Sequence, residues 1–292
     1  MAVNDVMVQP ASKMAASALG LRTISALVLA PPVLLVVYAG SPFFEAMLTA
    51  AAMVMVWEWN RLCNGGVFEI GGTIMALAIL GALASLAMGR PVLAPVALAI
   101  GAGALLGLPL VGRRQTGDGE ANSFLLPLWQ GAGMLCIGIP CLALLWLRGD
   151  PQLGRETVIW LFAVVWCVDI GAYAFGHMVG GPRLAPTLSP NKTWAGLVGG
   201  AAFSAVAGAV AAGFLGKAGW VPLAAVSAGL AVTAQGGDLV ESAMKRHFHA
   251  KDASNLIPGH GGLLDRVDGL LAASAVVALL GMTGSGSVLA WT

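Results

Sequence analysis

The sequence has 292 residues, of which 58% are hydrophobic and only 10% are charged, and its formal net charge is +1. An average soluble domain carries about 25% charged residues, so this composition lacks the polar surface that water requires. It predicts an integral membrane protein, and the scattered basic residues argue against nucleic-acid binding.

Apolar stretches of bilayer-spanning length recur along the chain. A mixed polar tail occupies residues 1–23. We expect nine spans after it, near residues 24–40, 43–60, 70–88, 91–111, 125–147, 157–180, 194–215, 218–244 and 264–283. The predicted fold class is therefore an all-α polytopic membrane protein. Small residues such as Gly199 and Gly200 in the later spans are typical of closely packed helices in lipid.

Basic residues predict the orientation of these spans. If the N-terminus is cytoplasmic, eleven Lys and Arg residues fall in cytoplasmic loops and four fall on the opposite side. Because cytoplasmic loops are enriched in basic residues, this asymmetry favours nine spans with the C-terminus outside. It also places the two most polar loops, 181–193 and 245–263, on the cytoplasmic face.

Two carboxylates in the early spans, Glu45 and Glu58, have no evident role. Glu58 lies beside Trp57, Trp59 and Arg61, a pattern typical of a side chain that extends to the cytoplasmic interface.

A polar segment joins the sixth and seventh spans. It contains D-I-G-A-Y-A-F-G from Asp169 and S-P-N-K-T-W from Ser189. Ser189 and Lys192 precede a helix whose first backbone N–H groups can face an anion. Two simpler interpretations stay open: Lys192 could serve only as a cytoplasmic anchor, and Asp169 could only pair with Arg183 or another polar group between helices.

Acidic residues recur where the eighth span ends and the ninth begins. The eighth span carries Asp238, Glu241, Ser242 and Lys245, which share one helical face, and the ninth carries Asp265 and Asp268. Carboxylates at membrane depth are costly without a partner, an ion or water. Two facing carboxylate pairs predict a site for a hard cation such as Mg²⁺, since no Cys or His set suits zinc.

The segment between these helix ends is rich in groups that bind phosphate. It contains Lys245, Arg246, Lys251, His260, Gly261 and Gly262. Glycine allows the backbone to approach phosphate oxygens, and Lys and Arg supply countercharge. This pattern favours metal-assisted phosphoryl or nucleotidyl transfer. The alternative is that Asp265, Arg266 and Asp268 form an ion-pair cluster that only anchors the helix end at the interface.

The whole segment S-A-M-K-R-H-F-H-A-K-D-A-S-N-L-I-P-G-H-G-G-L-L-D-R-V-D, Ser242–Asp268, resembles the motif of bacterial phosphatidate cytidylyltransferases, also called CDP-diglyceride synthases. The matching positions are Ser242, Lys245, Arg246, Lys251, Asp252, Ser254, Pro258, His260, Gly261, Gly262, Asp265, Arg266 and Asp268. The sequence G-D-L from Gly237 and both motifs of the polar segment are also similar, so the resemblance is strong from Asp169 onward. One departure is Ala195, where many members carry Glu.

The resemblance implies that CTP reacts with phosphatidic acid to give CDP-diacylglycerol and pyrophosphate. It implies a homodimer in the bacterial inner membrane, with residues 24–150 as N-terminal transmembrane helices, residues 151–292 as the catalytic region, and the active site facing the cytoplasm. Mg²⁺, with a second metal or a monovalent cation as a further option, is expected at Asp238, Asp265 and Asp268.

The remaining roles divide into two groups. The expected catalytic residues are Asp238, Asp265, Asp268, Lys245 and Arg246. The expected substrate or phosphate contacts are Ser189, Lys192, Ser242, Lys251, His260, Gly261, Gly262, Arg266 and Asp169.

Three alternatives differ in chemistry. A CTP-dependent polyprenol kinase of the wider superfamily would transfer the γ-phosphate to a lipid alcohol, which must lose a proton. An ion-coupled transporter would use Asp169 and Asp238 as a relay, although the chain has no convincing internal repeat. An inactive scaffold would tolerate the loss of Asp265.

Overall fold

Helices make up most of the computed structural model, which describes residues 28, 30–111, 120–216, 219–256, 261–284 and 286–291. The elements are a helix over Ala30–Ala39, α2 (Phe43–Cys63), α3 (Ile70–Ala87), α4 (Leu93–Val111), α5 (Glu120–Arg148), α6 (Gly154–Met178), β1 (Arg183–Ala185), β2 (Ser189–Thr193), α7 (Trp194–Phe214), α8 (Val221–His247), α9 (Leu264–Thr283) and the 3₁₀ turn η1 (Val288–Trp291).

Six helices in the described part of the chain are long and apolar enough to cross a bilayer. They are α3, Leu125–Arg148 of α5, α6, α7, α8 and α9. The expected multi-pass, helical membrane protein is therefore confirmed. The helix over Ala30–Ala39, α2 and α4 stand where the other three spans are expected, and the count of nine spans with its orientation stays a prediction.

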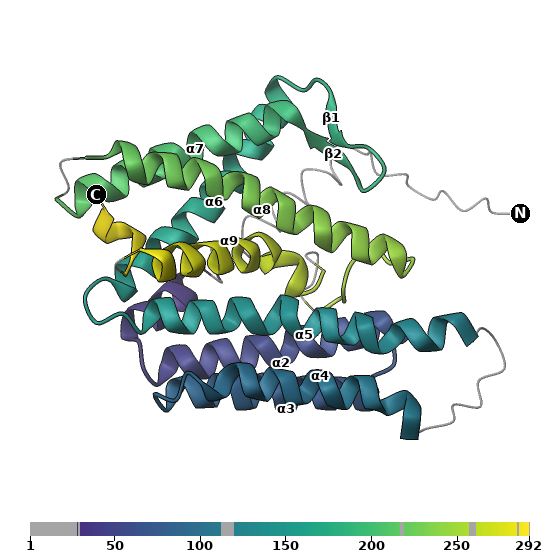
Figure 1. Ribbon diagram of the computed structural model, residues 1–292. Coiled ribbons are helices and arrows are strands. Elements are labelled where there is room, and N and C mark those ends of the chain that lie inside the picture. Colours follow the sequence, from purple (N-terminus) through teal and green to yellow (C-terminus); the bar gives the residue numbers. More distant parts are fainter. Residues whose placement is uncertain are drawn as a thin grey trace, which may run out of the picture.

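The helices pack in two groups (Figure 1). In the first group, α3 and α5 each contact α2 and α4 and also each other; in the second, α6 packs on α7, α7 on α8 and α8 on α9. The two groups meet where α9 lies against α5, and one continuous apolar core runs through both. The loop from α8 to α9 therefore lies near the N-terminal helices.

Glycines allow α6 and α7 to approach closely. A Cβ atom added to Gly199 would lie 2.8 Å from the carbonyl oxygen of Gly171, and one added to Gly200 would lie 3.0 Å from that of Val168. A larger residue would push the two backbones apart. The predicted packing role of Gly199 and Gly200 is confirmed.

Within the expected loop 181–193, a short hairpin forms. Strands β1 and β2 are antiparallel, with Arg183 opposite Thr193 and Ala185 opposite Ser189. The Thr193 hydroxyl accepts a hydrogen bond from the Gly196 N–H at 3.0 Å and so caps α7. The hairpin therefore fixes Lys192, the residue before this cap, next to the start of α7.

Candidate active site

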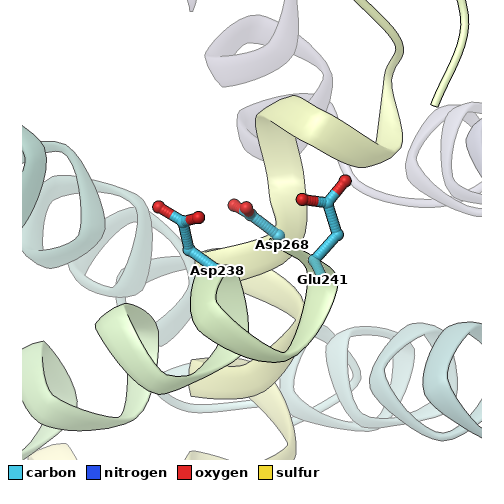
Figure 2. A group of neighbouring side chains, drawn as sticks. All are labelled: Asp238, Glu241 and Asp268. Carbon is cyan, nitrogen blue, oxygen red and sulfur yellow. The ribbon is translucent and has the colours of Figure 1, made fainter. Parts of the chain in front are cut away.

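Three carboxylates converge where α8 and α9 face each other (Figure 2). Asp238 and Glu241 lie one turn apart on α8, and Asp268 reaches them from α9. One oxygen of each carboxylate lies within 4.8 Å of one oxygen of the other two. Glu241 is buried, and the other two are half-buried. This group is called the acidic cluster below.

Glycine contacts explain why the two helices approach each other at this level. A Cβ atom on Gly237 would lie 2.9 Å from the Asp268 carbonyl oxygen and 2.6 Å from the Cβ of Ala272. One on Gly269 would lie 3.3 Å from the Cβ of Ala234. Each glycine precedes or follows an acidic residue of the cluster, so the close crossing of α8 and α9 brings their carboxylates together.

Two lysines offset the negative charge of the acidic cluster. The Lys192 ammonium lies 2.6 Å from Asp238 Oδ2, and the Lys245 ammonium lies 2.5 Å from Glu241 Oε2 and 2.7 Å from Asp265 Oδ1. The Ser242 hydroxyl donates to Asp238 Oδ1 at 3.3 Å.

The buried Glu241 carboxylate is incompletely satisfied. Among the described residues, neither of its oxygens accepts a hydrogen bond of good geometry, despite the nearby Lys245. A buried carboxylate with so few hydrogen bonds depends on neighbouring positive charge, which the Lys245 ammonium supplies here.

Asp265 has a different environment from the acidic cluster. Its carboxylate accepts hydrogen bonds from the N–H of Ala253 at 3.0 Å and of Gly262 at 2.7 Å, and from Lys245. These contacts hold the loop between α8 and α9. Asp265 is not in the three-carboxylate group among the described residues, and its assignment as a metal ligand stays a prediction.

The two glycines expected to approach phosphate are crowded by carboxylates of the chain itself. Gly261 has a φ of 80°, and a Cβ there would lie 2.7 Å from Asp265 Oδ2. A Cβ on Gly262 would lie 2.5 Å from Glu58 Oε1. Both positions therefore require glycine for a reason that the sequence pattern does not reveal. Their contact with phosphate stays a prediction.

The interpretation of Glu58 as an interfacial side chain is wrong. Glu58 is 0% exposed, and it accepts hydrogen bonds from the Ser254 hydroxyl at 2.6 Å and from the N–H groups of Leu263 and Leu264, both at 2.8 Å. The sequence signal was a carboxylate in an apolar stretch, but nothing near it in the chain indicates these partners.

Asp169, another predicted site residue, also lies beside the acidic cluster. Asp169 on α6 interacts electrostatically with Lys192, Asp238 and Arg266, which places it at the cluster. Arg183 instead donates to the carbonyl oxygen of Asn191 at 3.4 Å. In the described part of the chain, Asp169 therefore does not pair with Arg183.

The remaining predicted contacts are more peripheral. Ser189 is half-buried on β2, whereas Arg246 and Lys251 are exposed, and Arg246 donates to the carbonyl oxygen of Ala250 at 3.4 Å. His260 lies outside the described residues. Phosphate binding by these side chains stays a prediction.

Comparison with known proteins identifies the family of this site. Residues 20–283 match the model of the cytidylyltransferase family. The chain belongs to this family. The phosphatidate cytidylyltransferase of Brucella suis biovar 1 (strain 1330) is 39% identical over 265 residues, which cover 89% of this chain and 92% of that protein. That of Staphylococcus aureus (strain COL) is 42% identical over 120 residues, covering 40% and 46%.

These matches confirm the predicted family resemblance and extend it. The sequence motifs carry it from Asp169 onward, whereas the family match begins at residue 20. The N-terminal helices, including α2 with Glu58, therefore lie within the region that matches the family.

Proposed function

We propose that this protein transfers the cytidylyl group of CTP to phosphatidic acid, forming CDP-diacylglycerol and pyrophosphate. Similarity to a phosphatidate cytidylyltransferase over 89% of this chain supports this reaction. The observation that carries it in the structure is the acidic cluster flanked by two lysine ammonium groups, because two phosphate-bearing substrates need such countercharge.

The reaction needs no strong general base. A phosphomonoester has a second pKa of about 6, so the attacking oxygen of phosphatidic acid is already ionised near neutral pH. This oxygen forms a bond to the α-phosphorus of CTP, and the bond from that phosphorus to the bridging oxygen breaks. Pyrophosphate leaves with the electron pair. The protein must align the two anions and neutralise their charge.

Lys192 and Lys245 are suited to that neutralisation. Each ammonium group has three N–H donors and contacts carboxylates of the site. Each can therefore keep a carboxylate partner while another N–H group faces a phosphate oxygen. The resulting pairs would hold the substrates in the orientation that in-line attack requires.

The acidic cluster fits a hard divalent cation such as Mg²⁺. It offers carboxylate oxygens from Asp238, Glu241 and Asp268, and the buried Glu241 oxygens accept no hydrogen bond of good geometry among the described residues. We propose these three residues as its ligands. When bound, the ion would neutralise phosphate charge and orient the triphosphate.

The lipid substrate would reach the site sideways. The acyl chains of phosphatidic acid stay in the bilayer, so its phosphate must arrive at headgroup depth, near the ends of α8 and α9. We propose that this end faces the cytoplasm of a bacterial inner membrane, where CTP is available. A homodimer, expected from the family resemblance, stays a prediction.

Labelled CTP tests the proposed reaction. Purified protein with phosphatidic acid and Mg²⁺ should move a cytidine label into lipid and release a γ-phosphate label as pyrophosphate. A γ-label alone entering lipid would identify a lipid kinase instead.

Asp268→Asn tests the site in the same assay. We expect kcat/KM to fall by about 100-fold, because charge stabilisation in the transition state is lost. Membrane insertion should be unchanged. Glu156→Gln is the matched control, since Glu156 pairs with Arg155 at the start of α6, at the other end of that helix from Asp169. Full turnover by Asp268→Asn would refute the assigned site.

A further inference from the structure

The loop between α8 and α9 is held near both of its ends by carboxylates. Asp265 accepts from the N–H groups of Ala253 and Gly262. Glu58 accepts from the Ser254 hydroxyl and from the N–H groups that follow Gly262. Each carboxylate therefore joins an early loop residue to the start of α9. Asp265 belongs to α9 itself, whereas Glu58 comes from α2 in the other helix group.

Glu58 is well placed to fix the start of α9. The first N–H groups of a helix have no partner within the helix, and a negative charge there is favourable. Glu58 accepts from two of these groups, Leu263 and Leu264, with one oxygen for each. The serine hydroxyl supplies a third donor, so this fully buried carboxylate is well satisfied.

Asp268 lies one helical turn beyond this anchor. Its carboxylate completes the acidic cluster with Asp238 and Glu241 from α8. A shift of the first turn of α9 would therefore move Asp268 relative to its two partners. Glu58 itself lies outside that cluster, and both of its oxygens are directed to the loop and to α9.

We propose that Glu58 is a positioning residue for cytidylyl transfer. It holds the α8–α9 loop and the first turn of α9 so that Asp268 stays beside Asp238 and Glu241. The inference rests on the proposed function. It gives the N-terminal helices a role in the reaction, because α2 supplies the anchor for a site built on α6, α8 and α9.

Glu58→Gln tests this role with little change in side-chain size. The amide keeps one acceptor oxygen but turns its NH₂ group toward a donor, so at least one hydrogen bond is lost. We expect kcat to fall at least about tenfold while the KM for CTP changes less than about threefold, because misaligned reacting groups raise the barrier more than they weaken binding. Ser254→Ala, which removes one donor and no charge, should lower kcat by about threefold.

Glu45→Gln is the matched control. Glu45 lies on the same helix, α2, but in its first turn, at the opposite end from Glu58. It should keep the wild-type kcat. Kinetics are normalised to the folded, monodisperse fraction in detergent. Wild-type kcat in Glu58→Gln, or a loss that appears only as a higher KM or only as less folded protein, would overturn the proposal.

Limited proteolysis measures how firmly the α8–α9 loop is held, and it does not depend on enzyme activity. Lys251 is exposed and lies in the held loop, so trypsin should cut after it faster in Glu58→Gln than in Glu45→Gln. Fragment masses identify the cut. If the wild-type protein fails to transfer cytidine, the proposed function fails, and this comparison still decides the anchoring role: equal cleavage rates would refute it.

Discussion

Four carboxylates at the facing ends of α8 and α9 differ in what surrounds them. Asp238, Glu241 and Asp268 converge, whereas Asp265 accepts hydrogen bonds from two loop N–H groups. Lys245 connects the two environments, since it contacts both Glu241 and Asp265. At the scale of single residues, we therefore propose that Glu241 is a ligand of the cation and that Asp265 holds the loop.

Magnesium dependence separates these two roles. Glu241→Gln should raise the Mg²⁺ concentration for half-maximal activity at least about tenfold, because a ligand oxygen is lost. Asp265→Asn should lower kcat while this concentration changes less than about twofold, because Asp265 lies outside the acidic cluster and two of its three donors are N–H groups of the loop. The measurement is initial rate against Mg²⁺ at saturating CTP. A raised Mg²⁺ requirement in Asp265→Asn would instead support its predicted place among the metal ligands.

At the scale of elements, the close contact between α8 and α9 depends on two glycines, which have no side chain to separate the helices. Gly237 lies against the backbone of Asp268, and Gly269 lies against Ala234. The carboxylates of the acidic cluster therefore converge only because the two helices pack closely at these glycines.

Gly237→Ala tests this packing. The added methyl would meet the carbonyl oxygen of Asp268 and the side chain of Ala272, so α8 and α9 must separate. We expect a lower melting temperature and a loss of kcat/KM of at least about tenfold, since overpacking costs about 1–3 kcal/mol and moves the carboxylates. Thermal unfolding in detergent and the cytidine-transfer assay measure both effects.

Gly229→Ala is the control on the same helix. A Cβ at Gly229 meets no atom within 4 Å, and alanine is favoured over glycine in helices by about 1 kcal/mol. This variant should be as stable as the wild type, or slightly more so, and fully active. Wild-type activity and stability in Gly237→Ala would contradict the packing argument.

At the scale of the whole molecule, α6 connects two exposed segments that should lie on opposite sides of the membrane. Gln152 precedes this apolar helix, and Thr187 lies in the hairpin after it. The distribution of basic residues predicts that Thr187 is cytoplasmic and Gln152 is outside.

Cysteine labelling checks this orientation. Gln152→Cys and Thr187→Cys are made in a background in which Cys63, Cys136, Cys141 and Cys167 are alanine. A membrane-impermeant thiol reagent applied to intact spheroplasts should label only Gln152→Cys, and inverted vesicles should reverse the pattern. Labelling of both positions from one side would refute a spanning α6, and the opposite pattern would refute the predicted orientation.

The membrane class, the places of the helices and the family motif could all be predicted from the sequence. Each depends on local properties: the length of an apolar stretch, the spacing of residues on one helical face, and an uninterrupted motif from Ser242 to Asp268. The polar residues expected near the site include Asp169, Lys192 and Ser242, and the structure brings all three to Asp238.

Only the tertiary structure determined which groups the buried carboxylates contact. Glu58 meets Leu264 across 206 positions of the chain, and no local pattern encodes so distant a hydrogen bond. Likewise, Glu241 lies three residues after Asp238 and Asp265 lies three residues before Asp268. Yet Asp265 accepts hydrogen bonds from N–H groups of the loop, whereas Glu241 lies in the acidic cluster. Spacing along a helix selects the face on which a side chain lies, but the packing of distant segments selects what that side chain contacts.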